Sequence, residues 1–382
     1  MQIFTGAAIF DGVRLIHDAA LMVEDGVVAG VTAQAEVPDG ERISLSGGIL
    51  APGMIDLQVN GGGGIMVDGQ ADVLSLAAIC AAHAHLGATG ILPTLITDTP
   101  AATERVIAAG IAAAREAAPG FLGLHLEGPH LDPRRKGAHD SALIRPMEEA
   151  DLNRLCDAAK RLPSLMITVA PEALTIAQIS ALRDSGAVVS LGHSDCSTNS
   201  ARAAIEAGAT CVTHLFNAMS QLGNREPGLV GTVLDTSISA GLIADGIHVA
   251  PEAMRIALAA RRGGIFLVSD AMSVAGTDMT EFRLGGRRIL RRDGRLTLED
   301  GTLAGADLSL PQAVSVLVGI GIPAERALAM ATSVPAGVMG LGNKVGHLGP
   351  GRVADMIHID AGWSMDSVWL AGERVIPASQ IV

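Results

Sequence analysis

The chain has 382 residues, enough for one large domain or two, and 49% of them are hydrophobic. Its formal net charge of −13 argues against nucleic acid as the main partner, although a small anion can still bind a locally positive site. No signal peptide, no apolar run of roughly 18 residues and no C-x-x-C spacing is evident, so we expect a cytoplasmic protein with reduced thiols and no membrane span.

Both ends of the chain have short strand patterns separated by Gly-containing turns. The strand-like runs are 2–9, 20–23, 27–31, 354–359, 367–370 and 374–376. Neither end is long enough to bury a core alone. We therefore predict one small β-rich domain built from residues 1–50 and 342–382.

The middle of the chain, residues 51–341, alternates strand-like and helical patterns. Eight strands are predicted to begin near Ile55, Ile91, Phe121, Met166, Val188, Cys211, Ser239 and Phe266. Helical patterns cover 72–86, 101–117, 148–161, 174–184 and 198–207. This count predicts a (β/α)₈ barrel, with an open doubly wound sheet as the alternative.

Polar residues that follow the strands favour the barrel. They are Gln58, Asn60, Thr94, Glu127, Glu172, His193, His214, Asp245 with His248, and Asp270. Side chains at the carboxyl ends of all eight strands converge only if the sheet closes. A hairpin insertion is predicted over 281–303, and helical patterns resume over 308–318 and 323–332.

Two histidines stand at equivalent strand ends one strand–helix unit apart. Strand 188–191 leads to His193, and strand 211–213 leads to His214. Neighbouring parallel strands lie about 4.8 Å apart, so both imidazoles can share one metal ion. Glu127 follows another strand in the same way and would supply a third ligand. Three such ligands with an open position are typical of a catalytic zinc.

Other polar residues carry weaker signals. Asp270 ends a buried strand and could act as a general base that takes a proton from water and returns it to a leaving amine, or it could be an ordinary turn residue. His139, His248 and Arg225 lie in loops, where each by itself is more typical of a solvated residue. The glycine-rich segment 60–64 lacks the lysine of a phosphate-binding loop and predicts a flexible turn.

Several longer motifs occur in a fixed order along the chain. They are APGMIDLQVNG, HLEGPHLDPRRKGAHD, SLGHSD, THLFNAMSQLGNREPG, ADGIHV, VSDAM and GTLAG. With them the chain resembles the N-acetylglucosamine-6-phosphate deacetylase family of the amidohydrolase superfamily over nearly its whole length. The resemblance implies a (β/α)₈ barrel with a small β-sandwich formed by both termini. It also implies deacetylation of the 6-phosphorylated sugar to glucosamine 6-phosphate and acetate, in amino-sugar catabolism or cell-wall recycling.

The resemblance also assigns roles to individual residues. The implied metal ligands are Glu127, His193 and His214, and Asp270 is the acid and base. His139 would polarise the acetamide carbonyl, and His248 would hold the phosphate together with Arg225 from the partner subunit of a homodimer. The remaining implied substrate contacts are Ala138, Asn217, Ala218, Leu303, Ala304 and Gly305.

One position departs from the wider superfamily, in which His-x-His after the first strand binds a second metal. Here that position reads Gln58-Val59-Asn60, and amides are poorer zinc ligands than imidazole. We therefore predict one divalent metal per subunit, with zinc expected and iron(II), cobalt or manganese as alternatives. Two other hypotheses are a hydrolase of cyclic amides and a non-catalytic, metal-stabilised scaffold.

Overall fold

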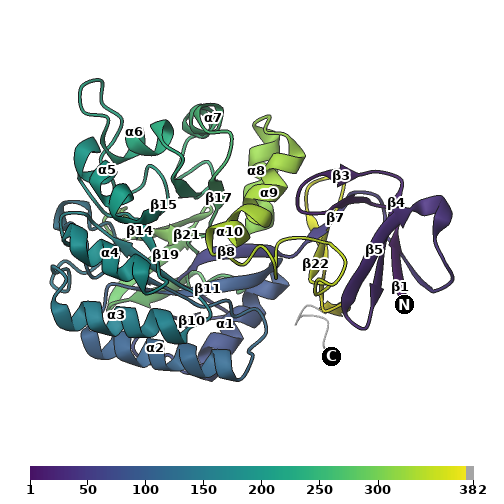
Figure 1. Cartoon of the computed structure of the whole chain (residues 1–382), viewed down its shortest axis with the longest axis horizontal. Coiled ribbons are helices and arrows are strands. Elements are labelled where there is room, and N and C mark those ends of the chain that lie inside the picture. The colour runs from purple at the N-terminus through teal and green to yellow at the C-terminus, as the bar shows by residue number, and fades with distance from the viewer. Residues whose placement is uncertain (376–382) are drawn as a thin grey trace.

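A parallel sheet of eight strands forms the centre of the computed structural model, which describes residues 1–375 (Figure 1). The strands run in spatial order as in the sequence, each paired with the next. They are β8 (Met54–Val59), β11 (Ala88–Ile96), β12 (Leu124–Glu127), β13 (Leu165–Val169), β14 (Val188–Leu191), β15 (Ala209–Val212), β16 (Ser239–Leu242) and β17 (Ile265–Leu267). Each begins within three residues of its predicted start, although Phe121 itself lies before β12, and the predicted barrel is confirmed.

The sheet is brought to closure where β17 meets β8. The Asp270 N–H donates to the Gln58 carbonyl at 3.1 Å, and Val59 forms a parallel bridge with Ala271. The buried carboxylate of Asp56 accepts the N–H of Ser269 at 3.1 Å. These contacts take the place of regular strand pairing between β17 and β8, a region that we call the seam. They also fix the position of Asp270 relative to β8.

Helices cover the outside of the sheet. They are α1 (Val73–His85), α2 (Pro100–Arg115), α3 (Glu149–Arg161), α4 (Ile176–Asp184), α5 (Thr198–Ala207), α6 (Gly228–Asp235), α7 (Pro251–Ala260), α8 (Leu310–Gly319), α9 (Ala324–Ala331) and α10 (Ser333–Val338), with 3₁₀ turns at Gln34–Glu36 and Pro133–Arg135. Polar side chains cap several N-termini, as Asp72 does for α1 and Thr99 for α2. The sequence patterns did not indicate α6, α7 and α10; α6 is short and contains two glycines, which weakens a helical pattern.

Strands from both ends of the chain pair with one another. One sheet has the order β5-β4-β1-β6 and the other β24-β23-β22-β7-β2-β3. Their bounds are β1 (Gln2–Thr5), β2 (Ala8–Phe10), β3 (Leu15–Ile16), β4 (Ala19–Glu24), β5 (Val27–Ala33), β6 (Glu41–Ser44), β7 (Ile49–Pro52), β22 (Met356–Ile359), β23 (Met365–Leu370) and β24 (Glu373–Val375). The predicted run 2–9 is therefore two strands in different sheets, and Ile376 of the last predicted run lies outside the described residues.

The two terminal sheets share a hydrophobic core that is separate from that of the barrel. Phe4 from β1 packs edge-on against Trp369 from β23, with ring centroids 5.3 Å apart. Leu21 and Met356 are buried in the same cluster. Figure 1 shows these strands beside the barrel rather than around it. The domain boundaries at residues 50 and 342 stay a prediction.

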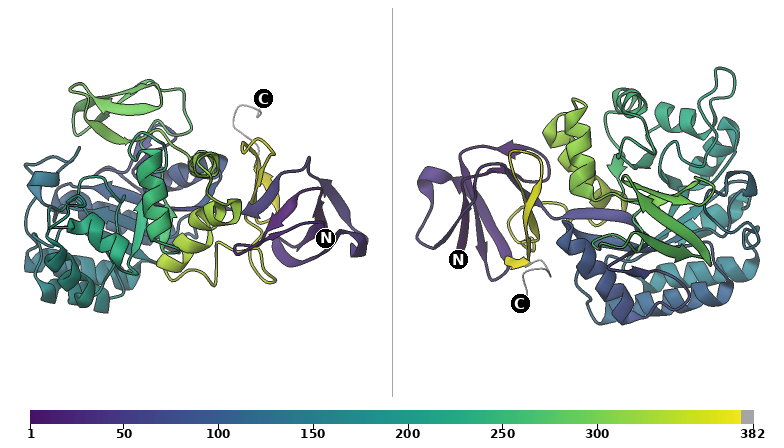
Figure 2. Two further views of the ribbon diagram at one scale, coloured as in Figure 1. Left: turned by 90° about the horizontal axis from the view of Figure 1, so that it is seen from above. Right: turned by 180° about the vertical axis from the view of Figure 1, so that it is seen from behind.

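The predicted insertion after the last barrel strand forms its own antiparallel sheet. It consists of β18 (Glu281–Leu284), β19 (Arg287–Arg292), β20 (Arg295–Leu298) and β21 (Leu303–Ala306). Figure 2 shows this sheet at one end of the barrel, apart from the terminal strands. A short pair, β9 (Gly61–Gly62) and β10 (Ile65–Met66), follows the first barrel strand. None of the helices within residues 1–375 is long and apolar enough to cross a membrane.

Candidate active site

A cavity of about 250 Å³ opens at the carboxyl ends of the barrel strands. The predicted site residues that line it are Glu127, Ala138, His139, His193, His214, Asn217, Ala218, His248, Asp270, Leu303 and Gly305. These residues come from segments up to 178 positions apart (127 to 305), so the closed barrel is what brings them together. Two predicted residues, Ala304 and Arg225, lie elsewhere.

Four non-glycine residues that line this cavity have a left-handed backbone: Ala218, with a φ angle of +49°, and the three polar residues His193, His214 and Asp270. The φ angles are +47° for His193, +26° for His214 and +52° for Asp270, each just beyond the end of a barrel strand. A residue other than glycine pays about 1 kcal/mol or more for such a conformation, although His and Asp tolerate it better than most. Strain of this kind clusters at functional sites.

Glu127, His193 and His214 form a compact set of possible metal ligands. Glu127 Oε1 lies 3.0 Å from His214 Nε2 and 3.3 Å from His193 Nε2, and the two Nε2 atoms are 3.2 Å apart. Atoms that share one tetrahedral zinc ion at about 2.1 Å lie roughly 3.4 Å from one another. The three side chains therefore fit one divalent ion with their present spacing.

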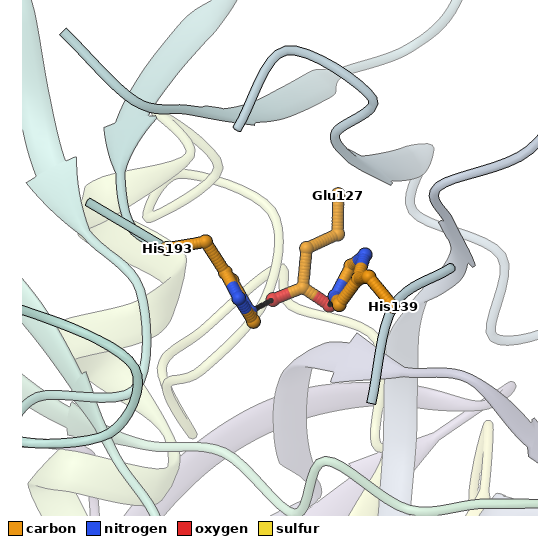
Figure 3. A group of neighbouring side chains, drawn as sticks. All are labelled: Glu127, His139 and His193. Carbon is orange, nitrogen blue, oxygen red and sulfur yellow. Dashed lines mark ion pairs between the residues drawn. The ribbon is translucent and has the colours of Figure 1, made fainter. Parts of the chain in front are cut away.

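His139 lies on the other side of the same carboxylate. Its Nε2 atom is 3.7 Å from Glu127 Oε2, and Figure 3 shows the carboxylate between the rings of His193 and His139. The group Glu127, His139 and His193 could also hold an ion, since its ligand atoms lie within 4.8 Å of one another. We favour His214 as the third ligand because its Nε2 atom is close to both other ligand atoms. His139 is instead hydrogen-bonded to Thr97, which suits it to donate a hydrogen bond rather than to bind a metal.

The backbone after β12 holds His193 in its orientation. The His193 Nδ1–H donates to the Arg135 carbonyl at 2.8 Å, since a carbonyl can only accept. The lone pair of Nε2 is thereby left for a metal. Gly137 allows this loop to approach, because a Cβ at that position would stand 3.3 Å from the His193 ring and the φ angle is +54°.

Thr97 orients His139. The Thr97 hydroxyl lies 2.7 Å from His139 Nδ1, and the Thr97 backbone N–H points at the same nitrogen at 3.4 Å. An N–H group can only donate, so Nδ1 is the acceptor and Nε2 carries the proton that faces the cavity. Burial, with the nearby His193, lowers the pKa of His139 to about 3, so the ring is neutral. A neutral imidazole with Nε2–H can donate to a carbonyl oxygen.

Asp270 is held by two side-chain amides. Its Oδ1 accepts from Asn60 Nδ2 at 2.7 Å and from Gln58 Nε2 at 3.1 Å, and the same Gln58 nitrogen also donates to Glu127 Oε1 at 3.1 Å. Burial, with the negative charge of Glu127, raises the pKa of Asp270 to about 6. A half-buried carboxylate with such a pKa suits a general base near neutral pH. The sequence marked Gln58 and Asn60 as a departure but not as partners of Asp270.

His248 is oriented by Asp245, three residues before it. The Asp245 carboxylate lies 2.6 Å from His248 Nδ1 and also accepts the backbone N–H groups of Ile247 and His248, each at 2.8 Å. Although burial opposes it, these hydrogen bonds and the charge of His248 lower the pKa of Asp245. An ionised Asp245 leaves His248 suited to bind an anion through its other nitrogen.

Asn217 and Ala218 line the cavity from the turn after β15. One backbone group of each residue already forms a hydrogen bond within the protein. The Asn217 N–H donates to the His214 carbonyl at 3.0 Å, and the Ala218 carbonyl accepts from Ser194 at 3.2 Å. The turn thus ties His214 to the segment after His193.

The predicted contacts at 303–305 belong to strand β21 rather than to a loop. The Ala306 N–H donates to the Asp270 carbonyl at 2.9 Å, so the strand is bonded beside Asp270. Gly305 permits this approach, because a Cβ there would lie 2.9 Å from the Asp270 carbonyl oxygen. Ala304 points the other way and packs into the core of the inserted sheet.

Arg225 does not line the cavity of its own subunit. It is exposed on the segment between β15 and α6. Its predicted reach into a neighbouring active site stays a prediction. The sequence did not indicate Ile96, Met272, Leu284 or Thr302, which also line the cavity; they lack an obvious chemical signal because three of them are apolar.

The fold and this site together define a hydrolase of the (β/α)₈ class, with the Asp270 carboxylate beside a set of side chains that could bind a metal. The chain belongs to the amidohydrolase family, whose family model matches residues 49–375. It is 37% identical to an N-acetylgalactosamine-6-phosphate deacetylase of Shewanella sp. (strain ANA-3), over 100% of this chain and 97% of that protein. It is 32% identical to an N-acetylglucosamine-6-phosphate deacetylase of Haemophilus influenzae, over 90% and 91%.

A solved structure that bears the same name as one of these relatives is also similar to this chain. The crystal structure of N-acetylglucosamine-6-phosphate deacetylase from Pasteurella multocida superimposes with a TM-score of 0.94 at 32% identity, over 98% of this chain and 99% of that chain. The similarity therefore extends over the barrel and the terminal strands alike.

Proposed function

We propose that the protein removes the acetyl group from N-acetyl-D-glucosamine 6-phosphate and releases D-glucosamine 6-phosphate and acetate. The observation that carries this proposal is the Asp270 carboxylate in the same cavity as Glu127, His193 and His214. The named relatives support an amino-sugar 6-phosphate as substrate. They also make a hydrolase of cyclic amides and a non-catalytic scaffold poorer hypotheses.

Glu127, His193 and His214 would hold one divalent metal, which we propose to be zinc. When bound, such an ion supplies Lewis acidity and lowers the pKa of water. A second ion is disfavoured because Gln58 and Asn60 already donate their amide N–H groups to Glu127 and Asp270.

The protein's own residues would carry the proton transfers. Asp270 takes a proton from the attacking water and then protonates the departing amine, as a general base and acid. The Nε2–H of His139 donates to the acetamide oxygen as negative charge develops there. His248 binds the phosphate, and this distant contact orients the amide for attack.

The quaternary arrangement and location are part of the proposal. The exposed Arg225 would reach the phosphate in the site of a partner subunit, which requires a homodimer. The four unpaired thiols, three of them buried, fit a reducing compartment such as the cytoplasm.

The second candidate substrate is N-acetyl-D-galactosamine 6-phosphate, because one of the relatives bears that name at 37% identity. Acetate release should be measured from both phosphorylated sugars and from unphosphorylated N-acetylglucosamine, with metal content determined on the same sample. Turnover of N-acetylglucosamine 6-phosphate at close to one metal per chain is the expected result. A clear preference for the galactose isomer would move the assignment to the second candidate, and turnover of neither would refute a deacetylase.

A further inference from the structure

A second cavity of about 460 Å³ lies next to the active-site cavity. Two side chains line both cavities, Ile96 at the end of β11 and Leu284 at the end of β18. They belong to one apolar cluster with Met272, which also lines the active site. Ile96 and Leu284, which we call the partition, therefore separate two spaces at the mouth of the barrel.

The partition stands opposite the phosphate side of the active site. Three strands lie between β11 and β15 on each side of the eight-stranded barrel, so the two strands face each other across it. Asn217 follows β15 and His248 follows the next strand, β16. Glu127 ends β12 and His193 follows β14, two strands that lie between β11 and β15.

If the proposed function is correct, this placement defines how the scissile amide of the bound substrate is oriented. The phosphate lies toward His248 and the carbonyl carbon lies beside Asp270. The methyl end of the acetyl group then points away from His248, toward the partition. An apolar contact is what a methyl group favours at that point.

We propose that Ile96 and Leu284 determine the length of the N-acyl group that the enzyme accepts. The second cavity is also lined by Asp98, Leu143 and Arg105, which do not line the active-site cavity. Arg105 is fixed there through a 2.6 Å hydrogen bond from Nε to the Gly69 carbonyl. With the partition in place an acetyl group ends against it, and with a partition side chain shortened a longer acyl chain extends into this space.

The test uses N-acetyl, N-propanoyl and N-butanoyl glucosamine 6-phosphate with the full-length, metal-loaded enzyme. The variants are Leu284→Ala and, as an independent change from the other side, Ile96→Ala. Leu143→Ala is the matched control, since Leu143 lines only the second cavity. Acetyl turnover by each variant checks that it has folded.

The wild-type enzyme should favour acetyl over butanoyl by at least about tenfold in kcat/KM, because each added methylene in a tight apolar pocket changes discrimination by roughly 10- to 200-fold. Either partition variant should reduce that preference by about tenfold or more, and Leu143→Ala should leave it unchanged. Equal use of both acyl groups by the wild type, or equal shifts in all three variants, would overturn the role of the partition. Failure of the wild type to release acetate would instead refute the proposed function.

Discussion

Asp270 depends on its neighbours for both its position and its protonation state. It is half-buried beside Glu127 and is held by Asn60 and Gln58, but it is not part of the compact ligand set. Asp270→Asn should therefore lower kcat by about 10²- to 10⁴-fold, which is the usual contribution of a general base, while the metal stays bound. Acetate release and metal content of the same sample would check this. Near-normal turnover with bound metal would assign the base elsewhere.

The side-chain amide of Asn60 should affect how kcat/KM depends on pH. Its hydrogen bond to Asp270 favours the carboxylate and so keeps the pKa lower than burial alone would. Activity requires the ionised base and is lost as the pH falls through the pKa of about 6. Asn60→Ala removes a hydrogen bond to a charged group, so the acid limb of kcat/KM should move up by roughly one to two pH units. A limb that stays in place would show that Asn60 does not act on Asp270.

At the scale of elements, the inserted sheet holds the loop that carries His139. Arg287 of β19 donates from Nη2 to the carbonyl of Ala138, which precedes His139. A small misplacement of a catalytic group can cost 100-fold, so Arg287→Met should lower kcat roughly ten- to hundredfold with a smaller change in KM. Arg287→Lys should restore part of the loss. The control is Arg288→Met, because exposed Arg288 pairs with Glu281 on the same sheet and does not contact the loop.

The seam between β17 and β8 should make the free energy of unfolding depend on pH. Burial raises the pKa of Asp56 from 3.8 to about 7, so the folded state binds a proton that the unfolded state releases. This contribution is fully present below about pH 4 and is lost as the pH rises through about 7, a change on the order of 4 kcal/mol. Asp56→Asn cannot titrate, so its stability relative to the wild type should improve between these limits.

Denaturant unfolding at several pH values would measure this difference. The exposed Asp157 on α3 supplies the control, because Asp157→Asn should follow the wild type across the range. A wild-type curve parallel to that of Asp56→Asn would mean that Asp56 does not change its protonation on unfolding.

The barrel strands and the residues at their ends could be predicted because both signals are local. An apolar run followed by His193 or Asp270 can be recognised within ten residues. The contacts that orient these residues are not local: Asn60 reaches Asp270 over 210 positions, and Arg287 reaches Ala138 over 149. No sequence pattern identifies the partner of either side chain, so only the folded structure reveals these contacts. The split of 2–9 into two strands was missed for the same reason, since each half pairs with a different distant segment.

At the scale of the whole molecule, the proposal that Arg225 serves the site of a partner subunit can be tested by mixing subunits. Arg225→Ala and Asp270→Asn should each be nearly inactive as homodimers, the first because the phosphate contact is lost. A hybrid dimer with one subunit of each kind has one complete site, in which intact Asp270 meets intact Arg225 from the other subunit. Statistical exchange makes half of the dimers hybrids, so about a quarter of wild-type activity should return.

Co-expression of the two variants with different affinity tags would isolate the hybrid and allow its rate to be measured directly. A rate of about half the wild-type value per dimer is expected for the pure hybrid. If Arg225 served its own subunit, the subunit with intact Asp270 would lack its own Arg225, and neither site of the hybrid would be complete. The hybrid would then be no more active than its parents, and Arg225 would have to act within one chain or not at all.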